Sequence, residues 1–232
     1  MHRILITGKL AREALERFAR EPDLEVDYRP DLPASQLLSL VADFDALVSR
    51  SETTIDRALI DGGTRLRVIA RAAVGVGNID IAYATERGIL VINTPGMNTN
   101  SAAELTLGLL IAAMRKIVPA HMTLMAQAWD RHRFTGHELR GKTIGIIGLG
   151  NVGHRVAKFA RGFDMHVLAY DPYLAPTVFE QHQAEAVSLE QLCRRSDVIT
   201  VHVPKTRETV SYTHLRAHET KANLVCRLLL EK

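Results

Sequence analysis

The chain has 232 residues, 47% of them hydrophobic, and a formal net charge of +3. This length and apolar content are enough for two lobes with buried cores. The net charge is small and the Lys and Arg residues are scattered along the chain, so the sequence shows no basic stripe that could bind a nucleic acid. The start HRILITG shows no signal-peptide pattern, and the longest apolar run, Leu105 to Met114 apart from Thr106 and Gly108, is too short for a bilayer. Two cysteines, Cys193 and Cys226, give no disulfide framework or metal-ligand spacing. We expect a cytoplasmic α/β protein with no metal site and no membrane or nucleic-acid partner.

Residues 1–97 alternate short apolar runs with helix-like segments. The runs are Ile4 to Ile6, Leu24 to Val26, Ala46 to Val48, Arg67 to Ile69 and Ile89 to Ile92. Strands that alternate with helices along the chain predict a parallel sheet covered by helices. We therefore expect a doubly wound, flavodoxin-like lobe over residues 1–97, which ends at the turn residues Thr94-Pro95-Gly96.

A long helical pattern follows, and we expect it to bridge two lobes. It begins near Ser101, with Glu104 three residues later at the spacing of a capping box. The pattern continues to about Trp129, with a break expected at Pro119 because proline interrupts helices. Residues 98–210 are expected to form the second doubly wound lobe.

The motif with the clearest chemistry is TIGIIGLGNVG, from Thr143 to Gly153. An apolar strand pattern ends in three glycines, and a helix pattern follows. Gly148 would allow a sharp turn, Gly150 would let a pyrophosphate approach the backbone, and Gly153 would let the helix pack close to the strand. The start of the helix would offer unpaired N–H groups and its positive dipole end to phosphates. The motif predicts a Rossmann dinucleotide-binding lobe.

The residues after this helix agree with dinucleotide binding. A second strand pattern, His166 to Tyr170, ends in Asp171, whose carboxylate could accept hydrogen bonds from ribose hydroxyls. The next residue is Pro172 and not an arginine that could bind a 2′-phosphate, so we predict NAD rather than NADP. The segment then continues to a strand pattern over Val198 to Val203. We interpret Thr143 to Val203 as one βαβαβ half of the lobe, with the second half missing.

The pattern changes at about Ser211. The segment SYTHLRAHETKANLVCRLLLEK has neither a glycine turn nor strand alternation, and it resembles a translated sequencing-adapter read-through. We expect residues 211–232 to be a non-native, non-homologous tail; the alternative is an amphipathic helix from Lys221 to Leu230. His214 and His218 have a helical spacing but no third ligand, so they do not predict a metal site.

Five motifs in order reveal a family resemblance. ARAAVGVGNIDI, GILVINTPGMNTNSAAELTLGLL, GKTIGIIGLGNVG, AYDP and SDVITVHVPKTRET resemble the D-2-hydroxyacid dehydrogenases, most of all their phosphoglycerate dehydrogenase branch, over about Met1 to Thr209. The resemblance implies hydride transfer between NAD and a small 2-hydroxy or 2-oxo acid. It also implies a substrate-binding N-terminal lobe, an NAD-binding second lobe that is incomplete here, and a homodimer formed through the NAD-binding lobe of the intact protein.

The resemblance also assigns residues to the two ligands. The cofactor residues are Val74, Gly148, Gly150, Asn151, Val152, Gly153, Asp171, His202, Val203 and Pro204. Gly75, Val76 and Gly77 match a loop whose N–H groups hold the substrate carboxylate. Arg50 matches a basic residue at the mouth of the substrate cleft, although a surface salt bridge is an equal alternative. Together with Arg71 it would give this cleft basic character.

The family's catalytic residues are not found in this chain. The resemblance places a catalytic arginine, and a histidine and glutamate that act as general acid and base, downstream of the matching region. We therefore expect an inactive fragment of a dehydrogenase with no catalytic residue of its own. One alternative is a non-catalytic NAD sensor or corepressor-like module. Another Rossmann enzyme, such as a methyltransferase, is disfavoured by the order of the strand-end acid and the His202-Val203-Pro204 segment.

Overall fold

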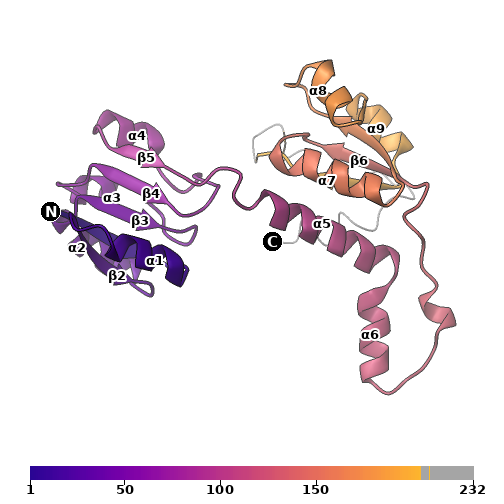
Figure 1. The fold of residues 1–232 in the computed structure, drawn as a ribbon, viewed down its shortest axis with the longest axis horizontal. Helices are drawn as coiled ribbons and strands as arrows, with labels where there is room; N and C mark the ends of the chain where they lie inside the picture. The colour runs from indigo at the N-terminus through magenta and orange to yellow at the C-terminus, as the bar shows by residue number, and fades with distance from the viewer. Residues whose placement is uncertain (205–208, 210–232) are drawn as a thin grey trace. The chain divides into compact units, whose positions relative to one another are not determined.

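The computed structural model describes residues 1–204 and 209, so the predicted tail, residues 211–232, lies outside the described residues. The chain divides into two compact units, Met1–Met97 and Asn98–Lys232. Each unit contains its own parallel sheet with helices packed on it (Figure 1). Among the described residues, no helix combines the length and apolar character that a membrane span requires.

The sheet of the first unit has the strand order β2-β1-β3-β4-β5, with all neighbours parallel. This is the flavodoxin-like order of a doubly wound sheet. It confirms the predicted α/β architecture of this part of the chain. The strands are β1 (His2–Thr7), β2 (Leu24–Arg29), β3 (Ala46–Ser49), β4 (Val68–Arg71) and β5 (Leu90–Ile92).

Both faces of this sheet are covered by helices because successive strand residues point to opposite sides. Ile4 and Ile6 pack with residues of α1, whereas Leu5 lies in the larger cluster that includes Leu37 of α2 and Ile60 of α3. The helices are α1 (Arg12–Ala19), α2 (Ala34–Leu40), α3 (Arg57–Gly62) and α4 (Ile81–Glu86), with a short 3-10 helix, η1 (Val41–Asp43). Because all neighbouring strands are parallel, their carboxyl ends lie at the same edge of the sheet.

The described sheet of the second unit has four parallel strands in the order β8-β7-β6-β9. This is the beginning of the Rossmann strand order. The predicted single half is therefore inaccurate in one respect, since β9 lies on the other side of β6 and belongs to the second half of the sheet. The elements are β6 (Thr143–Ile147), α7 (Asn151–Gly162), β7 (His166–Tyr170), α8 (Pro176–Gln181), β8 (Glu185–Ala186), α9 (Leu189–Arg195) and β9 (Val198–Val201).

The core of the second unit lies between β6, β7, α7 and a long preceding helix, α5 (Thr99–Met114). Figure 1 shows α5 running beside α7. The two helices approach closely because small residues, Ala103 on α5 with Ala157 and Ala160 on α7, are fully buried in this core. Helix α5 thus packs against α7 and contributes to the core of the second unit.

Two details of the predicted linking helix are wrong. Helix α5 begins at Thr99 after Asn98, so Ser101 and Glu104 lie inside its first turns and form no capping box. The helix breaks at Lys116, which has a left-handed φ of 52°, before α6 (Ile117–Met125) begins. Pro119 lies in the first turn of α6, where its missing N–H group is not needed for the helix.

Candidate functional site

The candidate site lies at the carboxyl end of β6. Strand β7 pairs with one side of β6 and β9 with the other, so the strand order reverses here. In open α/β sheets, ligands bind outside the carboxyl ends of the strands at such a switch point. The turn Gly148 to Gly153 follows β6, Asp171 follows β7, and His202 to Pro204 follow β9. The fold therefore brings the predicted cofactor residues of the second unit to one edge of the sheet.

Gly148 occupies a position that only glycine fits. Its φ is +90°, and a Cβ atom there would lie 2.6 Å from the backbone oxygen of His202 and 2.6 Å from Cγ1 of Val203. Its N–H group donates to the oxygen of Tyr170 at 2.8 Å. The turn after β6 is thus fitted closely against the segments that follow β7 and β9.

Gly150 and Gly153 differ in what surrounds them. A Cβ atom on Gly153 would lie 2.0 Å from the backbone oxygen of Gly148, so the start of α7 can approach β6 only because residue 153 has no side chain. A Cβ atom on Gly150 would meet no atom within 4 Å. The open space above Gly150 leaves the backbone accessible to a ligand, as the motif predicts.

The first turn of α7 presents backbone N–H groups to this open space. Gly150 is the N-cap and provides no capping side chain, and the first amides of any helix have no partner within the helix. The positive end of the helix dipole adds to their attraction for an anion. His154 is oriented by a contact between its Nδ1 and the oxygen of Gly150 at 2.8 Å, and its ring stacks on His182 at 4.7 Å.

The carboxylate of Asp171 is fixed by two backbone amides. Oδ2 accepts from the N–H group of Leu149 at 3.0 Å, and Oδ1 accepts from the N–H group of Tyr173 at 3.1 Å. Leu149 lies within the glycine turn, so the turn itself orients the acid. Each carboxylate oxygen keeps a lone pair that could accept a hydrogen bond from a hydroxyl group. This arrangement can bind the two neighbouring hydroxyl groups of a ribose. The negative charge of the carboxylate would repel a phosphate group on either hydroxyl, such as the 2′-phosphate of NADP.

His202 is a neutral residue of this edge. The backbone N–H group of His202 donates to the backbone oxygen of Ile147 at 2.8 Å, and its ring Nε2 lies 2.9 Å from Oγ1 of Thr200. Burial lowers the pKa of His202 to about 4, because a charged imidazolium is disfavoured away from water. His202 therefore carries no charge at pH 7 and contributes packing and hydrogen bonding to the site.

The remaining predicted residues lie in the first unit, after β3 and β4. Arg50 follows β3, and its Nη1 donates to the oxygen of Lys9 at 2.8 Å. Val74, which we predicted to be a cofactor residue, is 38% exposed and lies in the same loop as Gly75, Val76 and Gly77. The structure thus groups Val74 with the predicted substrate residues.

We predicted that Arg71 would contribute basic character to the surface of the substrate cleft, and this prediction is wrong. Only 2% of the residue is exposed. Its guanidinium group donates to the backbone oxygens of Arg50, Thr53 and Gly75 and to the side chains of Ser49 and Asn78. Arg71 and Asn78 therefore tie the loop after β3 to the loop after β4. The single sequence signal for this role is the position of Arg71 at the end of an apolar strand.

Comparison with known proteins agrees with this geometry. The family model described as D-isomer specific 2-hydroxyacid dehydrogenase, NAD binding domain, matches residues 107–225, which is about half of the chain. The match includes all four strands of the second sheet, and it extends into the segment that we predicted to be a non-homologous tail. The cofactor of the matched domain is NAD.

Three proteins illustrate the likeness. D-3-phosphoglycerate dehydrogenase from Archaeoglobus fulgidus is 44% identical over 208 residues, which are 90% of this chain and 39% of that protein. Hydroxypyruvate reductase from Thermotoga maritima is 39% identical over 208 residues, 90% of this chain and 67% of that protein. The crystal structure of the TT0316 protein from Thermus thermophilus has a TM-score of 0.81 at 37% identity and covers 89% of this chain and 66% of its own.

The chain therefore spans only about 39% of the length of the phosphoglycerate dehydrogenases it matches. The resemblance that the five sequence motifs predicted is confirmed, as are the α/β fold with its parallel sheets and the cofactor, NAD. The chain belongs to the D-isomer specific 2-hydroxyacid dehydrogenase family.

Proposed function

We propose that this chain is part of an enzyme that transfers hydride between NAD and a D-2-hydroxy acid of the 3-phosphoglycerate kind. Residues 98–210 form the NAD-binding lobe, and residues 1–97 form the substrate lobe. The observation that carries the proposal is the link between Asp171 and the glycine turn, made by the N–H group of Leu149 at 3.0 Å. This link supports the proposal, because a carboxylate that could bind ribose hydroxyls is hydrogen-bonded to the turn that precedes a helix terminus suited to phosphate.

Each part of the site has a distinct task in this proposal. The amides of Asn151, Val152 and Gly153 hold the pyrophosphate, and Asp171 accepts hydrogen bonds from the adenosine ribose. His202, Val203 and Pro204 line the adenosine side. In the first unit, Val74 contacts the nicotinamide, and the amides of Gly75, Val76 and Gly77 bind the substrate carboxylate. NAD itself supplies the hydride acceptor when it is bound.

The substrate and the chemical residues are also proposals. The likeness to D-3-phosphoglycerate dehydrogenases favours 3-phosphoglycerate, and the exposed Arg50 is the candidate for a contact at the mouth of the substrate cleft. Following the resemblance, the catalytic arginine, histidine and glutamate are supplied by sequence outside this chain. The chain alone would then bind NAD without turnover. A reducing, cytoplasmic location is consistent with the free thiol of Cys193.

A binding titration tests the proposed cofactor site. NADH fluorescence should change saturably when the chain is added, whereas NADPH should bind about tenfold or more weakly, because a 2′-phosphate would lie against the Asp171 carboxylate. Equal affinity for both nucleotides, or no binding by a folded sample, would refute the proposed site. To distinguish the enzyme from an NAD sensor, the full-length protein should be assayed for oxidation of 3-phosphoglycerate.

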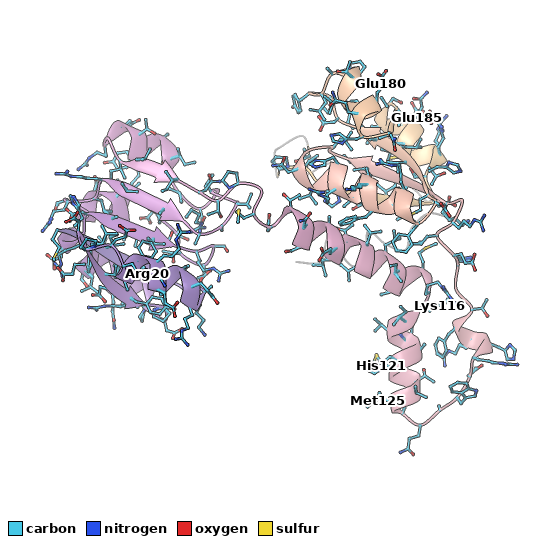
Figure 2. The ribbon with its side chains drawn as sticks, viewed as in Figure 1. Arg20, Lys116, His121, Met125, Glu180 and Glu185 are labelled. Carbon is cyan, nitrogen blue, oxygen red and sulfur yellow. The ribbon has the colours of Figure 1, made fainter. Side chains whose placement is uncertain are left out.

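The partner proposal is a homodimer formed through the NAD-binding unit. Helix α6 stands away from the sheet at the end of α5, and Lys116, His121 and Met125 follow one another along it (Figure 2). It contains no buried residue, and Met122, Met125 and Trp129 are 66%, 70% and 80% exposed. Exposed apolar surface of this extent is typical of an interface.

The hollow beside α6 gives this surface a shape that a partner could fill. It has a volume of about 490 Å³ and lies between α6 and residues 128–134, with Leu124, Trp129 and Phe134 in its walls. Sedimentation velocity should show a dimer that Met125→Glu converts to a monomer, because the introduced charge would be buried. Met97→Glu is the matched control, since Met97 is 80% exposed and lies in the other unit. A monomeric wild-type chain at every concentration would refute the homodimer.

A further inference from the structure

The loop after β4, residues 72–78, is tied to the first unit through its carbonyl groups. Five of its backbone oxygens accept hydrogen bonds: Ala73 from the amide of Thr94 at 3.2 Å, Val74 from Nδ2 of Asn93 at 2.8 Å, Gly75 from Nε of Arg71 at 3.4 Å, Val76 from the amide of Ile79 at 3.0 Å, and Asn78 from the amide of Ile55 at 2.8 Å. These hydrogen bonds fix the carbonyl groups toward the rest of the first unit. The N–H group of each peptide points away from its carbonyl group, so these hydrogen bonds also fix the direction of the N–H groups.

The N–H groups of this loop are free to bind a ligand. Within residues 1–204 and 209, none of the amides from Val74 to Gly77 donates a hydrogen bond. Gly75 and Gly77 are exposed, and a Cβ atom on either would meet no atom within 4 Å. Successive unpaired amides with open space in front of them form a receptor for a small anion.

A buried positive charge lies beneath the same loop. Arg71 is 2% exposed, and in the part of the chain that the structure describes no carboxylate is within ion-pair distance of it. Burial lowers the pKa of Arg71, and the negative charge of the exposed Glu52 opposes that effect from a distance. Buried charges normally have a partner of opposite sign. An anion on the loop would provide that partner.

Arg71, Asn78 and Asn93 form a hydrogen-bonded frame around the loop after β4. The side-chain oxygen of Asn78 accepts from Nη2 of Arg71, and its Nδ2 donates to the oxygens of Ser51 at 2.9 Å and Thr53 at 2.6 Å. The loop after β3 and the loop after β4 are therefore fixed relative to each other by two side chains. Asn93, at the end of β5, fixes the third side of the frame through Val74.

We infer that Arg71, Asn78 and Asn93 are positioning residues that hold the amides of Val74 to Gly77 in place to bind the carboxylate of a small 2-hydroxy acid. The donors of Arg71 already have protein acceptors. Arg71 therefore acts on the ligand by fixing the loop and through the electrostatic attraction of its positive charge, not by a direct hydrogen bond. The inference relies on the proposed function for the identity of the acid. The frame itself lies within the first unit and does not depend on NAD binding.

Amide NMR on the complete chain tests this inference directly. The probe is glycolate, the smallest 2-hydroxy acid, and the neutral control is glycolamide. Glycolate should shift the amide signals of Val74, Gly75, Val76 and Gly77 saturably, and glycolamide should not, because the receptor requires a negative charge. No shift of these signals with glycolate would overturn the inference.

Variants separate positioning from general stability. Asn93→Ala removes one exposed hydrogen bond and should weaken glycolate binding about three- to tenfold without loss of folding. Asn93→Asp should weaken it further, because a carboxylate would face the oxygen of Val74 and repel the ligand. Gln36→Ala is the matched control, since this exposed amide on α2 makes no side-chain hydrogen bond among the described residues. Wild-type glycolate affinity in Asn93→Asp would refute the positioning role.

The buried arginine needs a milder substitution. Arg71→Lys keeps the charge but loses most of the hydrogen bonds to the two loops, so glycolate affinity should fall. The amide NMR spectrum should still be that of a folded chain. NADH binding by the same sample should be unchanged. Unchanged glycolate affinity in Arg71→Lys would refute the positioning role of Arg71. In the wild-type chain, failure of glycolate binding with normal NADH binding would refute this inference alone, and glycolate binding without NADH binding would refute the proposed NAD site alone.

Discussion

Three glycines of α7 and its N-cap allow the packing and binding roles of the turn to be measured separately. A Cβ atom on Gly153 would lie 2.0 Å from the oxygen of Gly148, about 1.4 Å closer than an ordinary contact. Cβ atoms on Gly150 and Gly162 would meet nothing within 4 Å. The same Gly→Ala change should therefore have different effects at the three positions.

Gly153→Ala should lower the free energy of unfolding by about 2 kcal/mol. Forcing an extra methyl group into a packed site costs about 1–3 kcal/mol, and the upper end applies because the contact at 2.0 Å is with a backbone oxygen and not with the end of a flexible side chain. The better helix propensity of alanine offsets about 1 kcal/mol of this. NADH affinity should also fall, because the first turn of α7 must move away from β6.

Gly150→Ala should have the opposite profile. The N-cap cost and the reduced entropy of the unfolded chain nearly cancel, so stability should stay within about 1 kcal/mol of wild type. NADH affinity should fall at least about tenfold, since the methyl group would occupy the space of the pyrophosphate. Gly162→Ala, at the other end of α7, is the control and should raise stability by up to about 1 kcal/mol with unchanged affinity.

Urea denaturation measures the stabilities, and NADH fluorescence titration measures the affinities. If Gly153→Ala is as stable as Gly162→Ala, the close approach of α7 to β6 is not what residue 153 provides. If Gly150→Ala binds NADH as tightly as wild type, the pyrophosphate does not approach the backbone at this turn.

Two further substitutions test the charges of the site. Asp171→Asn should weaken NADH binding about tenfold and narrow the preference for NADH over NADPH, whereas the exposed control Asp31→Asn should do neither. The pKa of His202 is about 4 in the folded protein, below its ordinary value, so the unfolded chain binds more protons between pH 6.5 and 4 and stability falls as the pH decreases. Between pH 7 and 4.5, wild type should lose about 2 kcal/mol more than His202→Gln in urea denaturation; an equal loss in both would show that His202 is not buried in its neutral form.

The sequence was most informative where structure depends on neighbours along the chain. The predicted strand from His166 to Tyr170 has the observed bounds of β7, because a short apolar run between turn residues is a local pattern. The glycine turn and Asp171 were also recognisable locally, since their spacing is set by one strand, one turn and one helix.

Contacts between distant segments were decided by the tertiary structure. The reason that residue 148 must be glycine includes the oxygen of His202, which arrives only because β9 pairs with β6. Arg71 was expected on a cleft surface, but packing of the two loops buries it. The helix breaks at Lys116 rather than at the expected Pro119, just after Met114, which still packs against the core of the second unit. A sequence pattern reports local backbone preferences and the amphipathic character of each segment, whereas the packing of the complete sheet determines which residues meet and which amides remain unpaired.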